Sequence, residues 1–268
     1  MSKGFVWFCQ NNTSSDYVRC SIELAKSIKR HNKENKICVI TDEQTKFTSQ
    51  YVDVVRTVKK DESADHKIKW ANEYKAFQLT PFTHTIKLEA DMLWTDNTDW
   101  WWHYLCQHDL VFSVDCKNYK DSTIKDVRYR QLFLRNNLPN IYNGLSYFRK
   151  SIMAQTFYQT CEAITKNWIE IRNTCLINCH DEYPSTDVVY ALAYRILDPT
   201  NKQLIDFPWF KFIHHKPAIN GVERLRDQNN YLIPMRIKDK IVVGSQRINR
   251  VWHYVDKKMT EALDVRTF

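Results

Sequence analysis

The first third of the chain alternates between short apolar runs and one amphipathic stripe, and this order restricts the folds that it can adopt. Residues 4–9 form an apolar run of β-forming residues, which predicts a buried strand. Apolar residues at helical spacing follow, and they predict a helix that ends near the basic residues 29–31. Residues 37–40 and 52–58 are two further strand candidates. This opening predicts an α/β fold class.

Length and composition are those of a globular protein. The chain has 268 residues, of which 43% are hydrophobic and 26% charged, and it shows no internal repeat, low-complexity tract or Pro/Ser-rich linker. A single domain over residues 1–268 is therefore expected. No window approaches the roughly 18 consecutive apolar residues of a membrane span, and no secretory signal is recognisable, so we expect no transmembrane segment and a cytoplasmic location.

The eight cysteines are scattered and contain no C-x-x-C pair, which favours reduced thiols in the core. Cys175, Cys179 and His180 could form half of a zinc site, but no second ligand pair at zinc-like spacing lies nearby. Ordinary packing is the preferred interpretation of this cluster.

Glycine is scarce, and this excludes whole classes of nucleotide-binding protein. Only Gly4, Gly144, Gly221 and Gly244 are present, so neither G-x-G-x-x-G nor G-x-x-x-x-G-K-[ST] occurs. If the protein handles a nucleotide, a metal held by carboxylates is the natural substitute for a glycine cradle around the phosphates.

Residues 85–94 contain a pair of carboxylates that could hold such a metal. In a strand, the apolar side chains of this segment face one side, whereas Lys87, Glu89 and Asp91 face the other. The two carboxylates would then project together at the carboxyl end of the strand. The alternative is the ordinary polar face of an exposed edge strand.

The second half supplies further candidates. Residues 141–148 predict a turn or strand, and apolar residues between Met153 and Ile171 predict one long helix packed on the core. Another helix opens at residues 184–187 and runs through Leu197. The segments 212–217 and 251–257 carry histidines, and a neutral imidazole is a common metal ligand.

In this order, these features resemble the GT-A glycosyltransferases. The resemblance is strongest to the glycogenin and bacterial lipopolysaccharide galactosyltransferase type and to phage-encoded relatives, and it extends from about residue 4 to about residue 258. It rests on the ordered set of residues 5–11, the Tyr17-led helix, residues 87–91, Asn143-Gly144, residues 185–187 and residues 252–254. The resemblance implies a single Rossmann-like GT-A domain with a mixed sheet flanked by helices.

The resemblance also implies a donor and a metal. The donor would be a UDP-sugar across the carboxyl ends of the strands, with Mn²⁺ or Mg²⁺ bridging its diphosphate. Asp91 matches the last acid of the metal-binding triplet. Glu89 stands where the family usually has Asp, and it would bind the ribose, a metal-bound water or the metal itself. His253 matches the late histidine of the metal site, with His214 as second choice.

Positions elsewhere match the donor site residue by residue. Cys9, Gln10, Asn11 and Tyr17 match the loop that contacts uracil and ribose, and Lys75 is expected to contact a phosphate or the sugar. Two further elements of the family's site are changed in this sequence.

Asn143 and Gly144 retain the glycine and a neighbouring amide of the usual N-S-G. Asp187 is the last acid that survives of the family's D-Q-D, so the stereochemical outcome is left open. We expect Asp187 to act as a base toward the acceptor hydroxyl or as a positioning group, with His214 and His215 as alternatives.

Residues 1–115 would form the nucleotide-sugar half and residues 116–268 the acceptor half, which carries the metal-site histidine. The net charge of +8 and the pI near 9.0 suit a polyanionic partner, although a solvated basic surface explains them as well. One acceptor is a hydroxymethylated pyrimidine in phage DNA, contacted through the aromatic and basic residues 100–104 and 117–135; packing of those tryptophans against the sheet is the alternative. A lipid, saccharide or protein acceptor, a non-catalytic nucleotide-sugar-binding module, and a nucleic-acid-binding protein are the other hypotheses.

Overall fold

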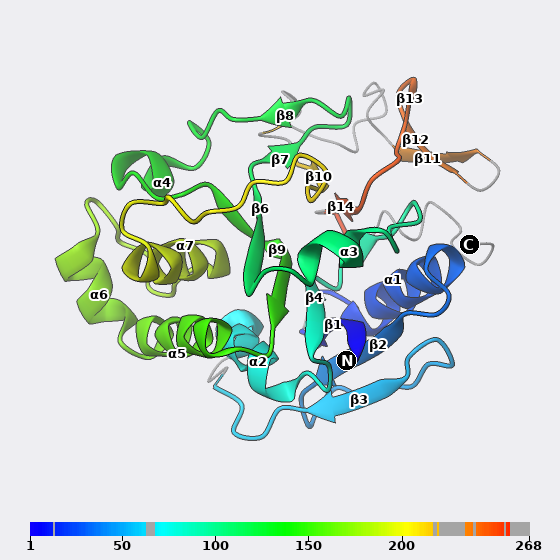
Figure 1. Ribbon diagram of the computed structural model, residues 1–268, viewed down its shortest axis with the longest axis horizontal. Coiled ribbons are helices and arrows are strands. Elements are labelled where there is room, and N and C mark those ends of the chain that lie inside the picture. Colours follow the sequence, from blue (N-terminus) through cyan, green and yellow to red (C-terminus); the bar gives the residue numbers. More distant parts are fainter. Residues whose placement is uncertain are drawn as a thin grey trace.

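A six-stranded mixed sheet forms the centre of the protein. The computed structural model describes residues 1–12, 14–62, 68–216, 219, 234–237, 240–254 and 256–257. The sheet has the order β3-β2-β1-β4-β9-β6, in which the first four strands are parallel and β9 runs antiparallel to both neighbours (Figure 1). Its strands are β1 (Lys3–Cys9), β2 (Lys36–Thr41), β3 (Val54–Thr57), β4 (His84–Leu88), β6 (Leu110–Val114) and β9 (Ile141–Arg149).

Helices cover both faces of this sheet. Alternate residues of β1 belong to different apolar clusters: Phe5 and Trp7 pack with the helices α1 (Tyr17–His31) and α3 (Trp101–Leu105), whereas Val6 and Phe8 face the other side. That other side is covered by the helices η1 (Lys69–Lys75), α2 (Ala76–Leu79), α5 (Ile152–Lys166), α6 (Trp168–Cys175) and α7 (Thr186–Leu197). The expected α/β fold class, a mixed sheet flanked by helices, is confirmed.

A second, smaller sheet joins distant parts of the chain. Its order is β5-β14-β10-β7-β8, and its residues share the apolar cluster that contains α1 and α3. The strands are β5 (Met92–Leu93), β7 (Cys116–Lys117), β8 (Thr123–Ile124), β10 (Ile213–His215) and β14 (Trp252–Tyr254). Outside both sheets lie α4 (Gln131–Arg135) and a three-stranded sheet of β11 (Pro234–Ile237), β12 (Lys240–Val243) and β13 (Gln246–Arg247).

Two local predictions are wrong. The strand predicted over residues 85–94 ends at Leu88, so Glu89 and Asp91 lie around a turn between β4 and β5. The long helix predicted from Met153 to Ile171 is broken at Asn167, whose side chain and backbone N–H both donate to Ala163 O and end α5.

Two of the three consecutive tryptophans at residues 100–102 are buried. Trp101 and Trp102 are buried against the sheet, whereas Trp100 and Tyr104 are half exposed and contact Trp209. All eight cysteines are free thiols. Among the described residues, no helix is both long and apolar enough to cross a membrane. Gly221, Pro217 and Val255 lie outside the described residues.

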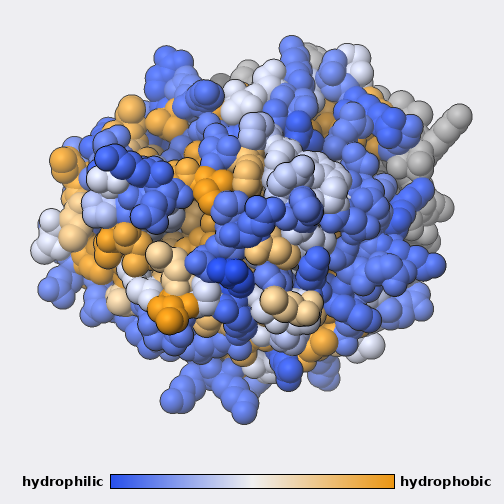
Figure 2. All heavy atoms as spheres, in the orientation of Figure 1, coloured by the Kyte–Doolittle hydropathy of each residue, from blue (hydrophilic) through white to orange (hydrophobic). Residues whose placement is uncertain are grey.

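The two halves of the visible surface differ in polarity. In the view of Figure 2, exposed apolar side chains gather over the half that carries α4 to α7, whereas the half around α1 is mainly hydrophilic. Exposed isoleucines of the apolar half include Ile152, Ile169, Ile177 and Ile196.

Candidate active site

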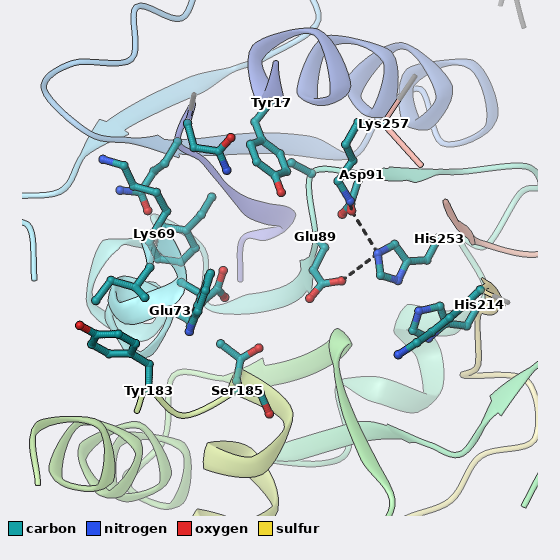
Figure 3. A pocket seen from close by; sticks show the side chains of 18 of the residues that line it. Tyr17, Lys69, Glu73, Glu89, Asp91, Tyr183, Ser185, His214, His253 and Lys257 are labelled. Atoms are coloured by element: carbon teal, nitrogen blue, oxygen red, sulfur yellow. Dashed lines mark hydrogen bonds and ion pairs between the residues drawn. The ribbon is translucent and has the colours of Figure 1, made fainter. Parts of the chain in front are cut away.

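A large cavity opens at the carboxyl ends of β1 and β4, where open α/β sheets commonly bind ligands. Its volume is about 980 Å³. The walls come from the loop after β1, the start of α1, helix η1, the turn after β4, the loop before α7, and strands β10 and β14. Figure 3 shows the side chains that point into it.

Three potential metal ligands meet in one wall of this cavity. Glu89, Asp91 and His253 each offer a ligand atom, and these atoms all lie within 4.8 Å of one another. His253 Nε2 lies 3.2 Å from Asp91 Oδ2 and 3.3 Å from Glu89 Oε2 (Figure 3). Within the part of the chain that the structure describes, no other group of three such residues is found, so Cys175, Cys179 and His180 do not form one.

Strand pairing assembles this cluster from segments far apart in sequence. β5 pairs antiparallel with β14, with His253 opposite Met92, and the Tyr254 N–H donates to Asp91 O at 3.2 Å. The histidine is thereby held beside the turn that carries both carboxylates.

Opposite charges and burial shift the pKa values of the cluster in different directions. Burial alone would raise the pKa of Asp91, but His253 and the Lys257 ammonium, which contacts its Oδ2, lower it overall. Burial raises the pKa of Glu89 and outweighs the nearby His253. For His253, the Asp91 and Glu89 carboxylates overcome burial and raise the pKa. The negative charge of Asp91 and the positive charges of His253 and Lys257 therefore stabilise one another.

This donor set fits a hard or borderline divalent cation. Two carboxylates and an imidazole are ligands that suit Mn²⁺, and Mg²⁺ is commonly bound through carboxylates. Gly144 packs closely against this cluster: a Cβ added there would lie 3.0 Å from Glu89 Oε2 and 3.0 Å from Met92 Cε, so these side chains would have to shift by a few tenths of an ångström.

A buried network of hydrogen bonds and one ion pair holds Glu89 in place. Lys87 is fully buried, forms an ion pair with Glu73, and donates to Asn143 Oδ1 at 2.8 Å. Because an ammonium only donates, it fixes the orientation of the Asn143 amide. Asn143 Nδ2 then donates to Glu89 Oε1 at 3.3 Å and to Thr186 Oγ1 at 3.2 Å.

The predicted nucleotide-contacting residues are divided between the cavity and the core. Gln10 and Tyr17 line the cavity. Cys9 is fully buried, and burial raises its thiol pKa to about 12. Asn11 Oδ1 accepts the Val18 N–H of the first turn of α1 at 3.1 Å, and Asn12 lines the cavity in its place.

Lys69, and not the predicted Lys75, lines the cavity. Lys75 is buried and binds Asn72 Oδ1 at 3.0 Å away from the cavity wall, whereas Lys69 lines it. Lys69 forms an ion pair with Asp42 at 2.7 Å, and Gln10 Nε2 donates to the same carboxylate at 3.4 Å. Asp42 is a buried acid, and its hydrogen bonds with Lys69 and Thr45 outweigh burial and lower its pKa.

The candidate bases are also separated. His214 lines the cavity with its ring centroid 4.6 Å from that of His253, and burial lowers its pKa. His215, the next residue of β10, packs against Trp252. Asp187 lies outside the cavity lining: its carboxylate accepts the Asn143 N–H at 2.7 Å and pairs with Arg130 at 3.0 Å.

Several cavity residues were not candidates in the sequence analysis, among them Lys69, Glu73, Tyr183 and Lys257. Lys257 lies four residues after His253, at the end of the histidine-bearing segment 251–257 that the sequence indicated. The others come from helix η1 and an irregular loop, for which no sequence pattern indicates which side chains face the site.

Comparisons with known proteins give a similarity in backbone only. No protein-family model and no curated protein matches this sequence. Among solved structures, the glycosyltransferase GlyE of Streptococcus pneumoniae TIGR4 is similar, with a TM-score of 0.43 and 15% sequence identity over 77% of this chain and 46% of that one. The chain therefore spans less than half the length of GlyE.

Proposed function

We propose that this protein is a metal-dependent glycosyltransferase that moves a sugar from a UDP-sugar to an acceptor hydroxyl. The observation that supports this most is the cluster of Glu89, Asp91 and His253 in the wall of a cavity of about 980 Å³ at the carboxyl edge of the sheet. A volume near the upper end of the usual range for ligand pockets suits a nucleotide-sugar.

In this proposal Asp91, Glu89 and His253 hold Mn²⁺ or Mg²⁺. A divalent cation there supplies positive charge for the diphosphate leaving group. Lys257 and Lys216, which also line the cavity, add cationic contacts for the diphosphate oxygens. The Asp91 carboxylate, which now contacts the Lys257 ammonium, would be neutralised by the bound cation.

The rest of the donor would lie along the same cavity. Gln10, Tyr17 and Lys69 form the wall for the uracil and ribose, and Ser185 and Thr186 offer hydroxyls to the transferred sugar. Residues 1–115 would thus supply the uracil and ribose contacts and both metal-binding carboxylates, and residues 116–268 would supply His253 and part of the acceptor side.

The proposed sugar transfer forms one bond at C1 of the sugar and breaks another. The acceptor oxygen bonds to C1 of the sugar, the bond from C1 to the β-phosphate oxygen breaks with its electron pair on UDP, and the hydroxyl loses one proton to a base. Two groups on opposite walls can take this proton: His214, as the sequence predicts, and Glu73 (Figure 3). Asp187, bound to Arg130 and Asn143, acts in this proposal as a positioning group.

UDP release from a panel of UDP-sugars tests this function. The wild-type protein with Mn²⁺ is expected to release UDP from one sugar donor, and EDTA or Asp91→Asn is expected to abolish release. A protein that binds UDP-sugar without turnover, with any acceptor added, would instead be a binding module. Lack of both binding and turnover would overturn the proposal. Adding DNA that contains 5-hydroxymethylcytosine to the same assay tests the DNA acceptor.

A further inference from the structure

A second cavity adjoins the first on the side away from the metal-ligand cluster. It has a volume of about 590 Å³, and four residues line both cavities: Ile68, Trp70, Glu182 and Tyr183. Tyr183 lies across the first cavity from His253 and His214 (Figure 3). A molecule in the second cavity therefore reaches the first over the edge formed by Trp70 and Tyr183.

The wall of the second cavity is aromatic and held in place. Trp70 Nε1 donates to Pro184 O at 3.0 Å, and Trp168 Nε1 donates to Asp181 O at 2.9 Å. Both indole N–H groups are thus used to anchor the loop before α7, to which Arg172 also donates at Asp181 O. Trp70, which is 42% exposed, can offer an apolar ring face to a ligand, whereas Trp168 is almost fully buried in the wall.

Charged groups around these rings are mainly acidic. Glu62, Glu170 and Glu182 line the cavity together with a single described lysine, Lys166. Lys166 Nζ lies 2.6 Å from Glu162 and 3.8 Å from Glu62, and Lys75 Nζ also lies 3.8 Å from Glu62, so the acidic excess comes from Glu170 and Glu182. Such a wall repels phosphates and offers carboxylate oxygens as hydrogen-bond acceptors to hydroxyl groups. The excess of acids is local, because the whole chain carries a net charge of +8.

We propose that the second cavity binds the acceptor and that this acceptor is a neutral saccharide. A sugar ring presents C–H groups that pack on an indole face and hydroxyls that donate to carboxylates. The apolar, aromatic faces of Trp70 and Tyr183 and the neighbouring acids match both features. A nucleic acid could stack on the same rings, but its backbone phosphates would meet Glu170 and Glu182. This inference rests on the proposed glycosyltransferase function.

The geometry of helix η1 connects this site to the chemistry. In a 3₁₀ helix, side chains at positions i and i+3 lie on the same side, so Trp70 and Glu73 share one side of η1. Trp70 borders both cavities and Glu73 lines the first. Glu73 is therefore the carboxylate that meets the hydroxyl of an acceptor seated on Trp70.

Acceptor kinetics with matched variants test the inference. UDP release is measured with Mn²⁺ against maltose, lactose, cellobiose, methyl glycosides and a DNA duplex that contains 5-hydroxymethylcytosine. Trp70→Ala is compared with Trp100→Ala, because the two tryptophans are 42% and 48% exposed and Trp100 lines neither cavity. Ile169→Ala is compared in the same way with Ile196→Ala, at 49% and 59% exposure.

We expect one neutral saccharide to stimulate UDP release, and Trp70→Ala to raise the KM for that saccharide about tenfold, as loss of a stacked ring does. Ile169→Ala should raise it about threefold, with both controls within about twofold of wild type. Ligand-observed NMR of the same saccharide should show the same loss of binding in Trp70→Ala.

Three results would overturn the inference while leaving the proposed function intact: stimulation by the DNA alone, stimulation by no neutral saccharide although UDP-sugar is hydrolysed, or an unchanged acceptor KM in both test variants. Absence of any Mn²⁺-dependent UDP-sugar binding or turnover in wild type would instead remove the proposed function, and the inference with it.

Discussion

Replacing Lys87 by Met tests whether the buried network behind the cavity is as tightly coupled as its geometry indicates. Lys87 is fully buried, whereas the Glu73 side chain is 13% exposed, so water reaches only one partner of the ion pair. Met fills a similar volume but leaves Glu73 without its cation and Asn143 Oδ1 without its donor. Breaking a buried pair costs about 3–5 kcal/mol, and the partial exposure of Glu73 places this case near 3 kcal/mol.

That loss corresponds to a fall in Tm of roughly 6–12 °C for a chain of this length. Urea unfolding of Lys87→Met, Glu73→Gln and the double variant gives the coupling energy directly. The double variant should cost about 2 kcal/mol less than the sum of the single changes.

The matched control is Lys36→Met, which breaks an ion pair with Asp53 in which the lysine side chain is 62% exposed. It should leave Tm within about 2 °C of wild type. A loss below about 1 kcal/mol for Lys87→Met, or additive costs in the double variant, would refute the reasoning.

Three further predictions concern the metal-ligand cluster and Asp42, the buried acid that pairs with Lys69. A saturating divalent cation, at about 100 times its Kd, should stabilise wild type by about 2.7 kcal/mol and raise Tm by roughly 5–10 °C in a thermal melt. Asp91→Asn should lose this rise, the exposed control Asp96→Asn should keep it, and a retained rise in Asp91→Asn would exclude Asp91 as a ligand. Gly144→Ala should weaken Mn²⁺ binding by up to about tenfold in a titration, because its Cβ would shift Glu89 or Met92 by a few tenths of an ångström, and unchanged affinity would contradict a close fit of Glu89 to the metal. Because the folded pKa of Asp42 is lowered from 3.8, its contribution to stability is full above that pH and is lost as pH falls through the folded pKa. The difference in unfolding free energy between wild type and Asp42→Asn should therefore shrink on acidification, and a constant difference would contradict the assignment.

Local patterns were sufficient for much of the central sheet and its helices. The apolar run of residues 4–9 is β1, the amphipathic stripe that follows is α1, and the helix predicted from residues 184–187 through Leu197 is α7, with Ser185 as its N-cap. In each of these segments, the spacing of the apolar residues and the residues at the end of the element predict the same secondary structure. The predictions failed where a single side chain ended an element, as Asn167 does between α5 and α6.

The metal-ligand cluster depends on contacts that no local pattern contains. β14 and β10 are three residues long, and their parallel register sets His253 beside His214, while β5 sets it beside Asp91. The sequence indicated the residue types and the order, and the resemblance indicated His253. Which lysine faces the cavity was decided by packing: Lys75 is turned to Asn72, and Lys69 to Asp42.

The central claim is that Glu89, Asp91 and His253 hold a divalent cation that binds a nucleotide diphosphate. Calorimetric titration of UDP into the wild-type protein, once with Mn²⁺ and once with EDTA, tests it most directly. We predict binding with Mn²⁺, and binding at least about tenfold weaker with EDTA or in Asp91→Asn, since one lost metal contact is worth more than 1.4 kcal/mol. Equal UDP affinity with and without the metal, or no affinity in either case, would contradict the account.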